Sequence, residues 1–152
     1  MTSIILSACV LVAVTVAVHA AGLAVLLRCF IKLDAPPPTH VWHITRMLLR
    51  MVWWLFLIHL AEILVWGLFY LWRGWLPNAE TAFYFSGTTY TTIGYGDVVL
   101  AKPWRLLGPI EGLTGILMCA LSTGYFFVVV SYIHQSRHVK ASANSTTEST
   151  PP

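Results

Sequence analysis

The stretch Thr91–Asp97, with the sequence TTIGYGD, holds the residues whose types and spacing best suggest chemistry. Gly94 and Gly96 lack a Cβ atom, so both adopt backbone dihedrals that other residues avoid. Such dihedrals let successive main-chain carbonyl oxygens point toward one axis. A Gly-x-Gly stretch alone is only a loop, so its meaning depends on the elements that position it.

The segment before TTIGYGD is predicted to be a short helix. Leu76-Pro77-Asn78 indicates a helix start, because proline is tolerated in the first helical turn, and Glu80 complements the positive helix end. A helix from about residue 78 to 89 is about 18 Å long, whereas a hydrocarbon core is about 30 Å thick. We therefore expect a re-entrant helix, buried in protein, that enters the membrane and returns.

Three long apolar segments, residues 4–27, 51–72 and about 106–133, flank this piece. Hydrophobic residues make up 57% of the 152-residue chain and charged residues only 10%, against about 25% charge in a soluble domain. Each segment is long enough to cross a bilayer as a helix. Trp104, just before the third segment, is expected to anchor the chain at the membrane surface. The predicted fold is therefore an all-α membrane protein with three transmembrane helices and one re-entrant helix.

A cleaved signal peptide is the alternative for residues 4–27, because Val18-His19-Ala20 resembles a cleavage site. The start of the chain carries no positive charge, however, and the apolar run is long for a signal peptide. We expect a retained transmembrane helix. It lacks the regularly spaced arginines of a voltage sensor.

Basic residues predict the orientation. Residues 28–50, expected to form a loop, hold four, and Arg137 and Lys140 follow the third span. Because basic residues favour the cytoplasmic side, we expect the N-terminus and residues 73–105 outside the cell membrane and the C-terminus in the cytoplasm. The expected domains are an N-terminal helix and basic linker (1–43), a membrane domain (44–140) and a disordered, low-complexity tail (141–152).

The TTIGYGD stretch resembles the pore loop of tetrameric potassium channels, whose signature is T-V/I-G-Y/F-G. The resemblance covers roughly residues 51–135 and looks closest to small single-pore prokaryotic channels and to the pore regions of two-pore-domain channels. It implies a homotetramer that passes K⁺ down its gradient, with the third span lining the inner pore.

The same resemblance implies the roles of single residues. The selectivity filter is Thr92, Ile93, Gly94, Tyr95 and Gly96. The carbonyls of the first four bind K⁺, with the Thr92 hydroxyl at the inner end. Ile93 and Tyr95 point away and pack behind the filter. The short helix aims its negative C-terminal end, near Tyr90, at the central cavity.

Residues expected to support the filter include Thr91 and Asp97. Some family members place a carboxylate four residues before the filter threonine, where this chain has Thr88, so a carboxylate pair with Asp97 is excluded. Tyr84 is a substitute hydrogen-bond partner for Asp97, or else it faces lipid or the core.

Glu62 and Glu111 lie inside spans, with His59 near the first of them, and an intramembrane acid is costly unless it is paired or faces water. We expect Glu111 to pack behind the short helix and bond to threonine or backbone groups; a direct role in conduction is the alternative. We expect Glu62 to anchor the second span to the same region. Gly112 and Gly115 serve either close helix packing or a gating hinge.

Other classes of function find less support. We find no catalytic constellation, nucleotide-binding loop or soluble ligand-binding domain, so we expect no enzyme and no cofactor besides the permeant K⁺. The net charge of +3 is too small to suggest nucleic-acid binding. Three cysteines, expected to be buried apolar residues, lack metal-ligand spacing. The remaining alternatives are a non-selective cation channel and a non-conducting membrane subunit or transporter component.

Overall fold

A computed structural model of the chain describes residues 2–31 and 41–148. Its elements are α1 (Thr2–Ile31), α2 (Val41–Trp72), α3 (Ala79–Tyr90), the 3₁₀ helix η1 (Trp104–Leu106) and α4 (Leu107–Glu148). Three stretches are long and apolar enough to cross a membrane: Thr2–Cys29, Trp42–Trp72 and Trp104–Tyr132. The described part of the chain is thus all-helical, as predicted.

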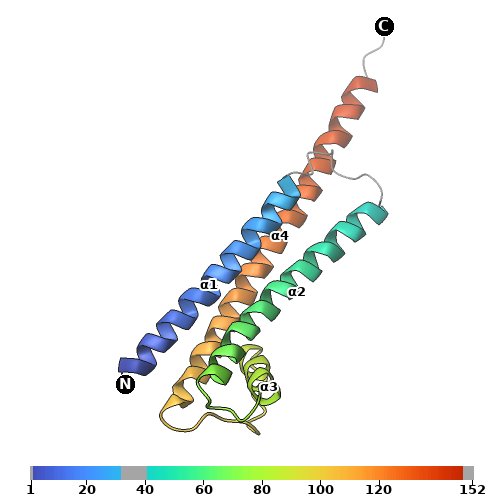
Figure 1. The fold of residues 1–152 in the computed structure, drawn as a ribbon. Coiled ribbons are helices and arrows are strands. Elements are labelled where there is room, and N and C mark those ends of the chain that lie inside the picture. The colour runs from blue at the N-terminus through green and yellow to red at the C-terminus, as the bar shows by residue number, and fades with distance from the viewer. Residues whose placement is uncertain (1, 32–40, 149–152) are drawn as a thin grey trace.

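The three long helices run side by side, and the short helix α3 packs against α2 and α4 near one end of the bundle (Figure 1). Helix α1 begins at the same end of the bundle as α3, and α4 ends at the opposite end (Figure 1). This relative placement is the one that the charge pattern predicted for the N-terminus and residues 73–105.

Two long helices extend beyond their predicted ends. Helix α2 begins at Val41, so residues 41–50, expected to form a loop, are helical. Helix α4 continues to Glu148, whereas the sequence predicted a disordered tail from residue 141. In both stretches glycine and proline are absent, and without these helix breakers a long apolar helix propagates into its flanks. The rest of the predicted 28–50 loop, residues 32–40, lies outside the described residues.

Polar side chains join α1 to α2. The indole nitrogen of Trp54 donates to the Gly22 carbonyl oxygen at 3.0 Å, and that of Trp66 donates to the Thr15 hydroxyl at 2.9 Å. Because such bonds inside an apolar bundle satisfy groups that lipid cannot, they hold α1 against its neighbour.

An aromatic cluster lies where α2 ends and α4 approaches. The ring of Trp75 stacks on that of Trp104, with centroids 4.1 Å apart, and the Arg73 guanidinium lies 5.1 Å and 5.4 Å from these two rings. Tryptophan and arginine together favour the boundary between lipid and water. The predicted interface anchor Trp104 therefore belongs to a cluster that closes this end of the bundle.

The cysteines differ from expectation. Cys9, Cys29 and Cys119 are all exposed in the single chain. Many large apolar residues on the long helices are exposed as well, which is typical of surfaces that contact lipid or another subunit.

Candidate functional site

The helix that leads to TTIGYGD is capped at both ends. Asn78 is the N-cap, and its side-chain oxygen accepts a hydrogen bond from the Thr81 amide at 2.8 Å. At the other end the Thr91 amide and hydroxyl both donate to the Gly87 carbonyl oxygen, at 3.1 Å and 2.6 Å. Asn78 therefore starts the helix from outside its first turn, and Thr91 ends it just before the glycines.

The backbone after Thr91 alternates in handedness. Thr92, Gly94 and Gly96 have positive φ angles of 61°, 51° and 80°, while Ile93 and Tyr95 between them do not. Such alternation brings main-chain groups of one kind to the same side of the chain. A Cβ atom at Gly94 or Gly96 would meet nothing within 4 Å, so the backbone conformation, not lack of space, requires glycine here.

Main-chain hydrogen bonds attach this backbone to α3. The Thr92 amide donates to the Thr89 carbonyl oxygen and the Gly94 amide donates to the Thr88 carbonyl oxygen, both at 3.0 Å. The Thr88 hydroxyl turns back into its own helix and donates to the Tyr84 and Phe85 carbonyl oxygens. Thr88 thus contacts the predicted filter through its carbonyl group.

Ile93 and Tyr95 are not packed within their own chain. Their exposed fractions are 55% and 70%, and every residue from Thr91 to Asp97 is exposed. The expectation that these two side chains pack behind the filter is therefore not met by the single chain.

Asp97 is bound by Tyr84. The Tyr84 hydroxyl donates to Asp97 Oδ2 at 2.7 Å, which decides between the two alternatives left open for this tyrosine. The bond to the carboxylate raises the pKa of Tyr84, so the phenol remains a donor at neutral pH.

Glu111 lies behind α3, as predicted, and is fully buried. Its carboxylate accepts hydrogen bonds from the Tyr70 hydroxyl at 2.7 Å and the Ser86 hydroxyl at 2.6 Å. The expected partners, threonine or backbone groups, were the wrong ones. Glu111 of α4 therefore joins α2 to the middle of α3.

Glu62 anchors α2 to the end of α3. The Tyr90 hydroxyl donates to Glu62 Oε2, and His19 Nδ1 and His59 Nδ1 lie 2.8 Å and 3.1 Å from the carboxylate oxygens. Sequence reasoning did not identify His19 or the Tyr90 hydroxyl as partners. The only signal was Glu62 itself, an acid that had to be paired.

A family model described as an ion channel matches residues 45–132, more than half of the chain. The chain belongs to this ion channel family. The match includes α3, TTIGYGD and the apolar part of α4, and it leaves out α1. No curated protein and no solved structure matches the chain.

Both candidate hinge glycines of the channel lie against the end of α3. A Cβ atom at Gly112 would lie 3.2 Å from the Thr89 carbonyl oxygen, and one at Gly115 only 2.1 Å from that of Tyr90. Since nonbonded heavy atoms do not approach that closely, Gly115 is required for close packing of α4 on α3. A hinge at either glycine stays a prediction.

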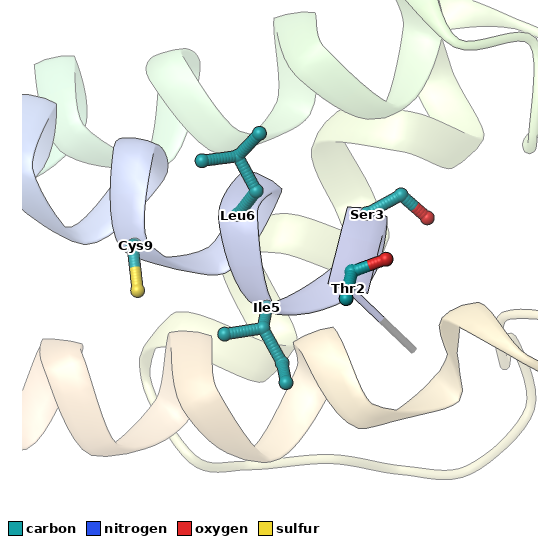
Figure 2. A pocket seen from close by; sticks show the side chains of 5 residues that line it. All are labelled: Thr2, Ser3, Ile5, Leu6 and Cys9. Atoms are coloured by element: carbon teal, nitrogen blue, oxygen red, sulfur yellow. The ribbon is translucent and has the colours of Figure 1, made fainter.

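The channel has two shallow surface hollows of note. One is lined by the first turns of α1, and Figure 2 shows that Ile5 and Leu6 there point to different sides of the helix. Because that surface is mostly apolar, with only Thr2, Ser3 and Cys9 adding polar or sulfur atoms, we assign it no ion site. The other lies between α2 and α4 and includes His59, Cys119 and Ser122.

Proposed function

We propose that the channel conducts K⁺ selectively and passively, without enzymatic activity, through a filter formed by Thr92–Gly96. The alternating positive φ angles at Thr92, Gly94 and Gly96 carry the proposal. They give the backbone the handedness needed to present a row of carbonyl oxygens, which replace the hydration shell of a dehydrated K⁺ ion. The carbonyls of Thr92, Ile93, Gly94 and Tyr95 are the proposed ligands.

The proposed assembly is a homotetramer. One chain supplies one wall of a carbonyl ring, so a closed ring needs several copies around an axis. The exposure of Ile93 and Tyr95 supports this assembly, because a neighbouring subunit would cover side chains that their own chain leaves bare. In this arrangement α4 lines the inner pore and α3 is the re-entrant helix.

Electrostatics adds support at the inner end of the filter. Helix α3 ends at Tyr90, and only its C-cap Thr91 separates it from Thr92, so the negative end of its dipole lies beside the proposed ion entrance and favours a cation there. The charge pattern places the N-terminus and α3 on the outer side and the C-terminus in the cytoplasm. The start of α1 and α3 lie at the same end of the bundle (Figure 1), so both would face the same side of the membrane.

The test is ion flux and reversal potential in liposomes that contain only the purified full-length protein. We expect the reversal potential in mixed K⁺ and Na⁺ to follow K⁺. Gly94→Ala should abolish selective flux, because alanine at a positive φ costs about 1–2 kcal/mol and shifts the carbonyls. Gly74→Ala is the matched control, since Gly74 also has a positive φ and open space but lies outside the filter.

Three outcomes would contradict the proposal. A reversal potential that follows Na⁺ as closely as K⁺ would indicate a non-selective cation channel, although the intact Tyr95 and Gly96 argue against one. Absence of flux under all conditions, from protein that is folded and inserted, would indicate a non-conducting subunit. If Gly94→Ala and Gly74→Ala reduced selective flux equally, backbone strain would explain the loss and the position of the filter carbonyls would not.

A further inference from the structure

A second cluster of chemically active side chains lies away from TTIGYGD. His19 of α1 and His59 and Glu62 of α2 each offer one ligand atom, and these atoms all lie within 4.8 Å of one another. His19 and Glu62 are 2% and 0% exposed, and His59 is about one-fifth exposed. Burying three such polar groups together inside an apolar bundle costs free energy, so a compensating interaction is expected there.

The donor set suits a zinc-type ion. Two imidazole nitrogens and a carboxylate oxygen form one of the common protein sets for Zn²⁺, which also leaves a fourth position open. At metal–ligand distances of about 2.1 Å, tetrahedral ligand atoms lie about 3.4 Å apart. The contacts of Glu62 with His19 at 2.8 Å and with His59 at 3.1 Å need only small side-chain adjustments to reach that spacing.

Neighbouring groups already orient two of the ligands. His59 Nε2 lies 3.1 Å from the Ser122 hydroxyl of α4, which leaves Nδ1 to face Glu62. The Tyr90 hydroxyl donates to Glu62 Oε2, which fixes the plane of the carboxylate. Such outer partners are typical of metal sites, where they set the tautomer of the histidine and the direction of the lone pair.

One atom of the cluster is unexplained by hydrogen bonding alone. His19 Nε2 is buried and has no hydrogen-bond partner within the part of the chain that the structure describes. A buried polar atom without a partner is rare and points to an ion or water beside it. It is not the nitrogen that contacts Glu62, which is Nδ1.

We propose that His19, His59 and Glu62 bind one divalent transition-metal ion per chain, with Zn²⁺ the best match. The ion joins α1 to α2 and, through Glu62 and Tyr90, lies next to the C-terminal end of α3. The hollow between α2 and α4, which His59 and Cys119 line, gives it a route from the surface. The site does not depend on which ion the channel conducts.

The experiment uses purified full-length protein, stripped with a chelator and titrated with Zn²⁺ and with Co²⁺. Calorimetry should give one Zn²⁺ per chain, and Co²⁺ should show the absorption bands of a tetrahedral site. His19→Gln and Glu62→Gln should abolish the saturable binding. Ser122→Ala should weaken it about 10- to 100-fold, since Ser122 only orients a ligand.

Cys119→Ser is the matched control, because Cys119 lines the same hollow but lies outside the three-ligand set; its binding should equal that of the wild type. The proposal is overturned if the folded wild type shows no saturable binding, or if His19→Gln binds as the wild type does. Should the ligand variants fail to fold, the wild-type titration and Ser122→Ala still decide. Binding is measured without flux, so a failed flux assay bears on the proposed function alone.

Discussion

Tyr84 of α3 donates a hydrogen bond of 2.7 Å to Asp97, the residue that follows the proposed filter. In the sequence Tyr84 precedes residues 91–96 and Asp97 follows them. Their bond therefore attaches the Gly96 end of that backbone to helix α3. Thr88, at the position where some family members carry a carboxylate, does not take part in this bond. In this chain the partner of Asp97 is therefore the tyrosine and not residue 88.

Tyr84→Phe should shorten the lifetime of the conducting state several-fold while K⁺ selectivity is retained, because the variant frees Asp97 but leaves the glycines in place. Single-channel recording measures both quantities. In a double-mutant cycle, Tyr84→Phe added to Asp97→Asn should cause little further change. Additive effects of the two substitutions would show that the bond does not stabilise the filter.

Glu111→Gln should lower the stability of the assembled channel by about 1–3 kcal/mol, because an amide cannot accept both the Tyr70 and the Ser86 hydroxyl groups as a carboxylate does. Thermal unfolding in detergent and open probability in bilayers are the measurements. Tyr70→Phe removes one of the two bonds and should cause a smaller loss. Unchanged assembly and open probability in Glu111→Gln would refute a supporting role.

Gly115→Ala should destabilise the channel by about 1–3 kcal/mol, since the added methyl group collides with the Tyr90 carbonyl oxygen and must push α4 away from α3. Gly124→Ala is the matched control, because its Cβ atom meets nothing within 4 Å and alanine favours the helix. Melting temperatures of the two variants give the comparison. If Gly115→Ala is as stable as Gly124→Ala, close packing is not the role of Gly115.

The orientation predicts which residues a membrane-impermeant thiol reagent can reach. In a background with Cys9, Cys29 and Cys119 replaced by serine, Glu80→Cys should react in intact cells, because the start of α3 is predicted to face outward. Gln135→Cys should react only after the cells are permeabilised, because Gln135 is exposed on α4 beyond its apolar stretch, which ends at Tyr132. The reverse pattern of labelling would contradict the predicted topology.

Much of the fold was predictable from the sequence, because span length and apolarity depend on local composition. Asn78 and Pro77 likewise marked the start of α3 to within a residue. The pairs Glu111–Tyr70 and Glu62–His19 were not predictable. They lie 41 and 43 residues apart, and the rotation of each helix about its own axis decides which side chains meet. Tyr84 and Asp97 are only 13 residues apart, which is why their bond was a workable hypothesis.

The two buried carboxylates hold α3 within its own chain, through Ser86 and Tyr90, whereas Thr91–Asp97 is left bare. A chain with a damaged filter therefore keeps the contacts that build its scaffold. In the proposed tetramer such a chain would join normal copies and spoil the ring that they share. Filter mutations should accordingly act as dominant, and mutations of Glu62 or Glu111 that prevent folding should act as recessive.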